Sequence, residues 1–302
     1  MNIPFIKYAK LWYVITIIVV LLSSASLFKY GLKYGIDFTG GSLLEVSFSQ
    51  TRPAVDKVKA VLDELGLKET VIQGSGDYKF IIRTNFLTED QHQLVLRQIR
   101  EKFQTPENTL HEERFETIGS AISAQLRQRA VWSIILVNLG IIAYMAYAFR
   151  RVSRPVASWK YGAMAVVAQL HDVLLVLGVF ALLGKFSGVE VGIDFVVALL
   201  TVIGFSVTDT IVVYDRIREN LLHHTGDNFA ETVNNGLNQT LMRSINTTMT
   251  VLLPLLALYF LGGSTIHSFA LALLIGMASG AYSSIFVASP LLVLVEKWQR
   301  RG

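Results

Sequence analysis

Cysteine is absent from this sequence of 302 residues. The absence excludes disulfide bonds, thiolate metal sites and cysteine nucleophiles, and it removes the usual indicator of the redox compartment. The sequence also contains no G-x-S-x-G, no H-E-x-x-H and no glycine-rich phosphate loop followed by Lys and Ser or Thr. We therefore do not expect an ATPase, and we predict a protein that is not an enzyme and has no metal or cofactor.

Apolar residues, in contrast, are abundant: they make up 52% of the chain, and the mean hydropathy is +0.47. An ordinary soluble domain contains roughly 45 to 50% apolar residues, so we expect most of this chain to lie in lipid. The net charge of +4 does not indicate nucleic-acid binding, because the basic residues flank apolar segments and are not interleaved with aromatic residues.

Long apolar stretches dominate the sequence. A helix needs about 20 mostly apolar residues to cross the hydrocarbon core, and six stretches meet this requirement: 11–28, 131–149, 161–183, 191–213, 241–261 and 269–295. We therefore predict a polytopic α-helical membrane protein with six transmembrane helices. The first stretch has an alternative interpretation as a cleaved signal peptide, because Lys7 and Lys10 precede it and Ser24, Ala25 and Ser26 imitate a cleavage site.

Basic residues beside the apolar stretches predict the orientation of the chain. They are Lys7 and Lys10 before the first stretch, Arg150, Arg151, Arg154 and Lys160 between the second and third, Arg216 and Arg218 between the fourth and fifth, and Lys297, Arg300 and Arg301 after the sixth. All of them lie on one side of the membrane if both termini are cytoplasmic, and only Lys185 lies in a short outer loop. We therefore expect cytoplasmic N- and C-termini.

A polar stretch of soluble type separates the first two apolar stretches. It divides the chain into an N-terminal tail with the first helix (1–30), an extracytoplasmic domain (31–129) and the other five helices (130–302). The pattern predicts a strand, a helix opened by Pro53, two strands around a turn at 74–77, a helix that begins with a capping box of Thr88 and Gln91, and a last strand. The order βαββαβ predicts an α+β ferredoxin-like domain, which by itself implies no chemistry.

Few ionisable side chains lie inside the apolar stretches. Each costs roughly 2.5 to 3.5 kcal/mol to insert, so such residues are functional candidates: His171 and Asp172 in the third stretch, Asp209 in the fourth and Arg243 in the fifth. Asp209 lies on the order of 10 Å outward of Arg216 along a helix, so the antiparallel neighbour brings Arg243 to a matching depth. We predict that the carboxylate and the guanidinium meet there, and that Asp209 binds and releases a proton as the arginine moves away and returns.

A polar stripe accompanies Arg243 on its helix. Helical spacing places Gln239, Arg243, Asn246, Thr247 and Thr250 on one face, which we expect to be buried. Asn246, Thr247 and Ser206 are expected to support a file of water molecules. Blander interpretations stay open: Arg243 extends only to the inner surface, Asp209 is a structural acid at a helix end, and His171 or Asp172 hydrogen-bonds a neighbouring helix.

Glycines are expected to serve two purposes, a sharp turn and close packing of helices. In the segment GIDFTGG, which follows the first apolar stretch, Gly40 and Gly41 are expected to allow a sharp turn, while Asp37 and Thr39 bond freed backbone amides. Together with Phe38, this motif is expected to fix how the outer domain is attached to the first helix. The alternative is that the segment is only a connector. A second GIDF occurs at 192–195, and we attribute it to coincidence. Within the spans, close packing is expected at Gly178, Gly204, Gly276 and Gly280.

The motifs GIDFTGG, HD, TDTIVVYDRIREN, NQTLMRSINTTMT and ASGAYSSIFVASPLL occur in this order over nearly the whole chain and resemble the SecF family, the smaller half of the bacterial SecD–SecF pair. The resemblance implies a subunit of the resistance-nodulation-division (RND) superfamily in the bacterial inner membrane, working with SecD, YajC, the SecYEG translocon and translocating preproteins. It implies that the proton gradient drives protein export, with Asp209, Arg243 and Thr247 on the proton path. The alternatives are an RND-type exporter of small molecules or lipids, and a scaffold subunit that moves no protons.

Overall fold

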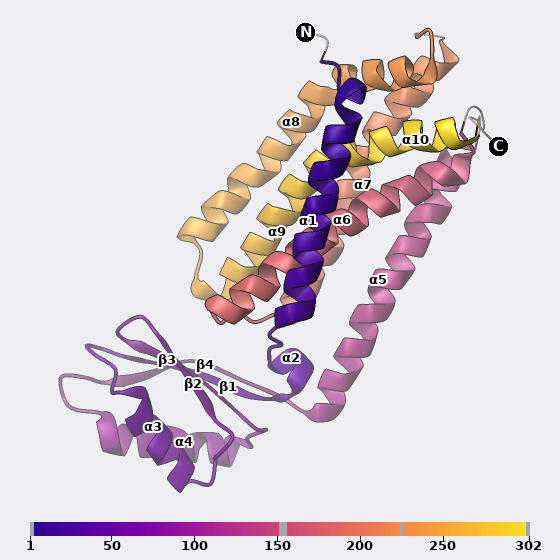
Figure 1. Cartoon of the computed structure of the whole chain (residues 1–302). Helices are drawn as coiled ribbons and strands as arrows, with labels where there is room; N and C mark the ends of the chain where they lie inside the picture. The colour runs from indigo at the N-terminus through magenta and orange to yellow at the C-terminus, as the bar shows by residue number, and fades with distance from the viewer. Residues whose placement is uncertain (1–2, 151–155, 224–225, 300–302) are drawn as a thin grey trace. The chain divides into compact units, whose positions relative to one another are not determined.

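The computed structural model describes residues 3–150, 156–223 and 226–299. The chain divides into two compact units, one formed by residues 1–33 with 130–302 and the other by residues 34–129 (Figure 1). The first unit is helical, and the second combines a sheet with helices.

The helical unit consists of long helices with short connections. Its elements are the 3₁₀ turn η1 (Ile6–Tyr8), α1 (Ala9–Tyr30), α5 (Ser120–Ala148), which begins in the second unit, α6 (Ser158–Phe186), α7 (Ile193–Leu222), α8 (Phe229–Leu261), α9 (Ser264–Ser283), η2 (Ser284–Ala288) and α10 (Ser289–Gln299). Within the described residues, six helical segments are long and apolar enough to cross a membrane, the last of them combining most of α9 with η2 and α10. The six spans expected from the sequence are therefore confirmed.

Glycines bring the helices of this unit close together. A Cβ atom built on Gly276 of α9 would lie 2.3 Å from a methyl group of Val202 on α7, and one on Gly178 of α6 would lie 2.5 Å from the Cα atom of Ser23 on α1. Gly280 is in similar contact with Ser206. These positions are close-packing sites, as expected, whereas Gly204 has no atom within 4 Å of such a Cβ, so the same prediction was wrong there.

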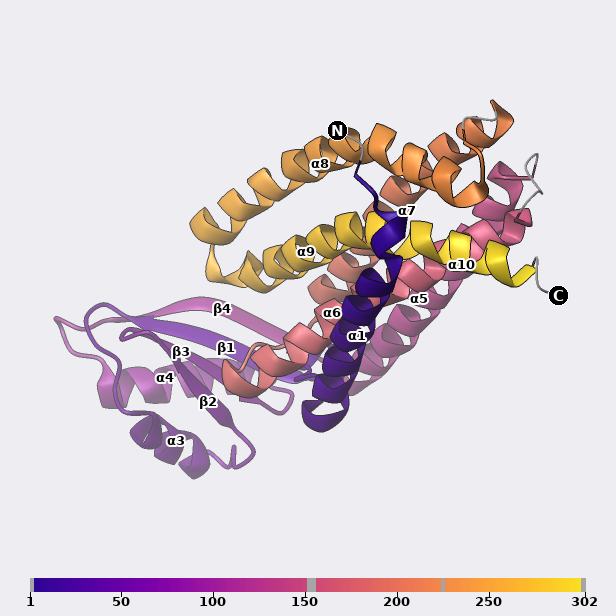
Figure 2. The same cartoon turned by 45° about the horizontal axis from the view of Figure 1, so that its top comes forward.

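The sixth span contains a π-helical turn, η2, between α9 and α10. Pro290 explains its position, because proline has no N–H to donate to the carbonyl group four residues earlier and its ring collides with that carbonyl. The hydroxyl of Ser289 donates to the backbone oxygen of Ser284 at 2.9 Å, and Tyr214 Oη of α7 donates to the oxygen of Ala288 at 3.0 Å. Side chains thus satisfy carbonyl groups in the widened turn. Figure 2 shows α10 continuing the path of α9 beyond it.

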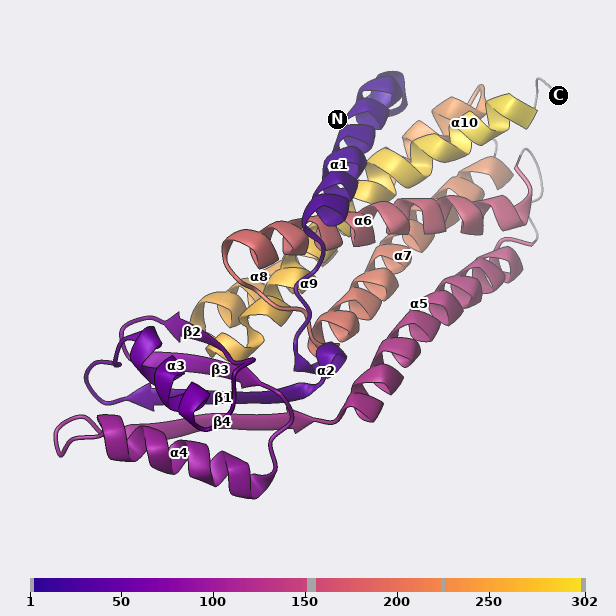
Figure 3. The same cartoon turned by 60° about the horizontal axis from the view of Figure 1, so that its bottom comes forward.

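The second unit is a four-stranded sheet with helices on one face (Figure 3). Its elements are the short helix α2 (Ile36–Thr39), β1 (Gly41–Phe48), α3 (Val55–Glu64), β2 (Val71–Ser75), β3 (Lys79–Thr84), α4 (Glu89–Phe103) and β4 (Leu110–Ile118). The strands lie in the order β2-β3-β1-β4, and each neighbouring pair is antiparallel. Alternate residues of β1, such as Leu44, Val46 and Phe48, point into a core shared with α3 and α4. The ferredoxin-like βαββαβ order is confirmed.

The helix starts and the hairpin turn predicted for this unit were partly correct. Thr88 and Gln91 form the expected capping box at the start of α4. Helix α3 begins at Val55, after Pro53, because Ala54 is still extended. Gly74 and the residue after it belong to strand β2, so the hairpin turn begins later than predicted, at Gly76, whose φ of 60° suits glycine.

Candidate functional site

Asp209 lies in the middle of α7, and only 8% of its surface is exposed. Ser244 Oγ of α8 donates to Asp209 Oδ1 at 2.6 Å, and the hydroxyl of Ser284, the first residue of η2, donates to Oδ2. Among the described residues, no ion pair includes Asp209. The carboxyl group is therefore enclosed by neutral hydroxyl groups.

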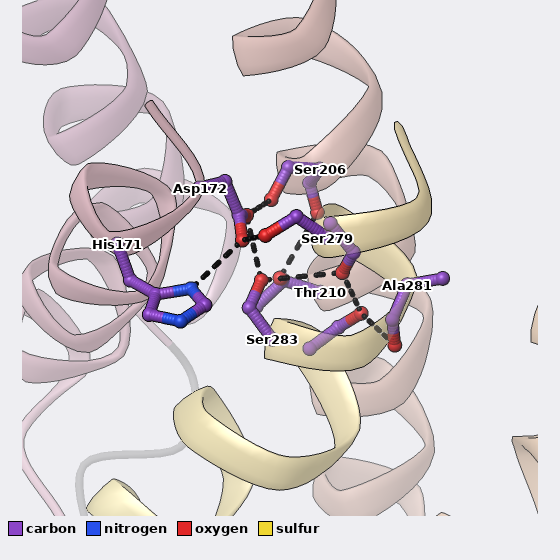
Figure 4. Close-up of polar contacts among 9 residues, drawn as sticks. His171, Asp172, Ser206, Thr210, Ser279, Ala281 and Ser283 are labelled. Carbon is purple, nitrogen blue, oxygen red and sulfur yellow. Dashed lines mark hydrogen bonds and ion pairs between the residues drawn. The ribbon is translucent and has the colours of Figure 1, made fainter. Parts of the chain in front are cut away.

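Asp172, on α6, is buried completely. Its Oδ1 accepts hydrogen bonds from Ser279 Oγ at 2.6 Å, and its Oδ2 accepts from Ser206 Oγ at 2.7 Å and Ser283 Oγ at 2.6 Å. The imidazole of His171 approaches Oδ1 through Nδ1 at 3.1 Å. Figure 4 shows side chains from three helices meeting at this acid. Of the secondary candidates, the structure thus brings His171, Asp172 and Ser206 together.

Two consecutive serines of the sixth span serve different acids. Ser283, the last residue of α9, donates to Asp172, and Ser284 donates to Asp209. Consecutive residues of a helix point about 100° apart, which allows one stretch of chain to contact acids on two different helices. The two acids therefore share a structural element, although they lie on α6 and α7.

The structure does not bring Arg243 to Asp209. The side of α8 that faces the acid is made of Thr240, Ser244 and Thr248, four residues apart and all buried. Arg243 precedes Ser244 and so points to another side, which is exposed. The expected contact between carboxylate and guanidinium is therefore not present in this chain.

The polar stripe on α8 is exposed, not buried as the sequence suggested. Gln239, Arg243, Asn246, Thr247 and Thr250 all lie on the outer surface of the helical unit. Asn246 and Thr247 thus do not line the surroundings of Asp209, and Ser206 is bonded to the other acid. The prediction failed because periodicity shows which residues share a face and does not show which face is covered.

Four serines that hold the two acids were not predicted from the sequence: Ser244, Ser279, Ser283 and Ser284. A signal was available for the first three. Ser279 and Ser283 are four residues apart in an apolar span, and so are Ser244 and each of its buried threonine neighbours. Hydroxyl groups at this spacing lie on one side of a helix. The role of Ser284 had no such signal, because it depends on the π-helical turn.

The GIDFTGG segment forms the short helix α2 and the start of β1. Phe38 is buried, Asp37 is half-buried, and Gly40 and Gly41 have positive φ angles of 75° and 114°. The hydroxyl of Thr39 donates to the carbonyl oxygens of Gly35 and Gly40, each at 3.1 Å. The expectation that Thr39 bonds freed amides was therefore wrong, since a hydroxyl at this place is closer to carbonyl groups. The sharp turn at the two glycines is present.

The fold and the site define a multi-pass membrane protein in which two carboxylic acids are enclosed by apolar helices. Comparison with known proteins narrows this class. Residues 98–298 match the family described as protein export membrane protein SecD/SecF, C-terminal, and residues 25–51 match the SecD/SecF GG motif. The chain belongs to the SecD/SecF family. Relatives that it matches over nearly their full length are SecF subunits.

Particular relatives show how far the similarity extends. The protein translocase subunit SecF of Thermobaculum terrenum is 42% identical, over 99% of this chain and 95% of the relative. That of Anaerolinea thermophila is 39% identical over 90% of this chain and 89% of the relative. Among solved structures, SecDF of Thermus thermophilus, described as a translocon-associated membrane protein, is similar with a TM-score of 0.82 and 36% identity over 98% of this chain. This chain spans 39% of that longer protein.

Proposed function

We propose that this chain is a subunit of the Sec protein-translocation machinery in which Asp209 binds and releases protons. The observation that supports this is the enclosure of Asp209 by the hydroxyl groups of Ser244 and Ser284. A hydroxyl group donates to an ionised carboxylate and accepts from a protonated one, so both forms of the acid keep hydrogen-bond partners. A guanidinium in contact would favour the ionised form alone. The surroundings of Asp209 therefore suit an acid that changes its charge.

The exposed side of α8 is the proposed contact with SecD. An arginine side chain that faces lipid within a membrane span is costly, so a protein partner is favoured over lipid beside Arg243 and Thr247. In the most apolar 18-residue segment of α8 only 11% of the residues are buried, against 56% in that of α7. A relative that is a single SecDF chain, of which this chain spans 39%, supports SecD as the partner. In this complex Arg243 and Thr247 complete the proton path.

The proposed setting is the bacterial inner membrane, with both termini in the cytoplasm and the ferredoxin-like domain outside. Basic residues at the start of the chain, at the end of α7 and at the end of α10 support this orientation. The proton-motive force supplies about 2.3 kcal/mol per proton for each 100 mV of potential. We propose that this energy, used with SecD, YajC and SecYEG and without another cofactor, helps to draw preproteins outward. The curated relatives support this function and not export of small molecules or lipids.

The Asp209→Asn variant tests the proposal, because its amide keeps hydrogen bonds to both serines and binds no proton. Asp215→Asn is the matched control, since Asp215 lies on the same helix, is exposed, and forms an ion pair with Arg218 at 2.6 Å. We expect Asp209→Asn to lose the part of preprotein translocation that depends on an imposed proton gradient, and Asp215→Asn to keep it. The measurement is translocation into inverted membrane vesicles that contain the complex with SecD. Full gradient-dependent translocation by Asp209→Asn would refute the proposal.

A further inference from the structure

Asp172 has more hydrogen-bond donors than Asp209 and less access to solvent. Three serine hydroxyls and one imidazole nitrogen surround its carboxylate, which has no exposed surface. An ionised carboxylate accepts about four hydrogen bonds. The site therefore provides a full set of donors for the ionised form, collected from α6, α7 and α9.

The charge of Asp172 has one partner. Among the ion pairs of the described residues, Asp172 takes part only in that with His171, whose side chain is 4% exposed. A buried charge is costly unless an opposite charge lies beside it. A proton on the imidazole gives the pair a net charge of zero, whereas a neutral imidazole leaves an uncompensated negative charge inside the bundle. A proton bound by the pair therefore balances its charge.

The imidazole has a free position for this proton. Nδ1 faces Asp172, and Nε2 is buried without a hydrogen-bond partner among the described residues. Figure 4 shows the ring turned so that Nδ1 meets the carboxylate. The ring of Tyr282 lies 6.0 Å away, and its hydroxyl is also buried without a partner. When Nδ1–H donates to Asp172, Nε2 has a lone pair that accepts a proton.

Few titratable groups face the pair from the surrounding elements. Helix α9 contributes Tyr282, α7 contributes Asp209 one turn beyond Ser206, and η2 contains none. Helix α1, which packs against α6, carries Tyr13, and α5 meets α6 through the neutral amide of Asn138. Helix α10 lies beside the beginning of α6, near Lys160, and carries the buried Glu296. Among these groups, Asp209 is the acid that is linked to the pair by the consecutive serines of one stretch of chain.

We propose that His171 and Asp172 form a second proton-binding site, at which the proton binds Nε2 of His171, and that Ser283 and Ser284 couple this site to Asp209. The bond formed is N–H at Nε2, the proton comes from water, and no electron is transferred. The coupling follows from the two consecutive serines, because a change in the hydrogen bond of Ser284 to Asp209 shifts the chain that positions Ser283. This inference takes the proton-carrying role of Asp209 from the proposed function, but the binding of a proton at His171 does not depend on it.

Nuclear magnetic resonance of ¹⁵N-labelled histidine, with the full chain in lipid nanodiscs, tests this proposal without a translocation assay. The sequence contains 6 histidines, and His171→Asn identifies the signal while an amide replaces the donor to Asp172. We expect Nδ1 of His171 to carry hydrogen, as its approach to Asp172 suggests, and Nε2 to take up a proton as the pH is lowered. We expect proton uptake at Nε2 to change in Asp209→Asn, because Ser283 and Ser284 link the two acids.

Two further variants test whether Ser284 couples His171 to Asp209. Ser284→Ala removes the link to Asp209 and is expected to displace the titration of His171 as well. Thr208→Ala is the matched control, because Thr208 is exposed, precedes Asp209, and donates its hydroxyl to the Gly204 oxygen of its own helix, at 2.8 Å. The proposal is overturned if Nε2 of His171 takes up no proton as the pH is lowered, or if Asp209→Asn and Ser284→Ala leave its proton uptake as it is in Thr208→Ala. Loss of gradient-driven translocation in Asp209→Asn with no titration at His171 would uphold the proposed function and reject this second site.

Discussion

Gly41, the first residue of β1, lies where a side chain has no room. A Cβ atom at this position would lie 2.5 Å from the carbonyl oxygen of Thr84, the last residue of β3, and the φ angle is 114°. The obstacle is backbone in a paired strand, so a rotamer change cannot relieve it. The perturbation we consider is Gly41→Ala, which adds one methyl group and leaves the charge unchanged.

The magnitude follows from two contributions. A left-handed or similar backbone conformation costs a residue other than glycine about 1 to 2 kcal/mol, and forcing extra volume into packed structure costs about 1 to 3 kcal/mol. Gly76→Ala is the matched control, because Gly76 has a φ of 60° and nothing within 4 Å of the added Cβ, so only the first contribution applies. We therefore expect Gly41→Ala to destabilise the sheet by about 1 to 3 kcal/mol more than Gly76→Ala.

Hydrogen exchange of the full chain in nanodiscs measures this difference, read by mass spectrometry on peptides that cover β1 and β3. The expected difference corresponds to opening of the β1–β3 pair roughly fivefold to more than a hundredfold more often in Gly41→Ala than in Gly76→Ala. Exchange from α6 and α7 is the internal reference and should stay unchanged. Equal exchange of β1 in the two variants would show that the carbonyl of Thr84 moves aside freely, and the steric reasoning would be refuted.

Two more predictions concern packing and helix ends. Gly276→Ala should force α9 away from Val202 and lower the thermal unfolding temperature of the detergent-solubilised protein. Gly204→Ala, with nothing near its Cβ, should leave that temperature unchanged or raise it. Equal unfolding temperatures for the two variants would contradict the close packing of α7 and α9. Thr88→Ala should remove the capping box with Gln91 and cost about 1 kcal/mol at the start of α4. Faster hydrogen exchange confined to the first turn of α4 is the expected result, and unchanged exchange there would contradict it.

The fold was predictable because its signals are local. Six apolar stretches of sufficient length require six helices in lipid, whatever the rest of the chain does. In the other unit, the alternation in β1 and the capping box of Thr88 each specify an element from a few neighbouring residues. The exact place of the β2–β3 turn was missed, because Gly74 suits a strand end or a turn equally well when only the sequence is known.

The two acids of the site were predictable, but most of their partners were not. Asp209 and Asp172 were found because charge inside an apolar stretch is conspicuous. Of their partners, His171 and Ser206 were among the candidates. The other serines were not, because a hydroxyl group in a helix usually bonds its own backbone, as Thr208 does here. Arg243 was assigned to the wrong side of α8, since periodicity shows which residues share a face and does not show which face is buried. Which serine reaches which acid depends on helix rotation, and the π-helical turn alters that rotation locally.

The widened turn η2 also decides what a change in chain length does at this point. A π-helical turn holds one residue more than an α-helical turn, so deleting a residue between Ser284 and Ala288 would let the helix run on regularly through the sixth span. The residues beyond the deletion would keep their rotation about the helix axis, and Leu292 and Val293 would stay in the core. Deleting a residue from the regular part of α10 would instead rotate everything beyond it by about 100° and shift it by about 1.5 Å. The widened turn is therefore a place in the sixth span where the loss of a single residue leaves both halves on their proper faces.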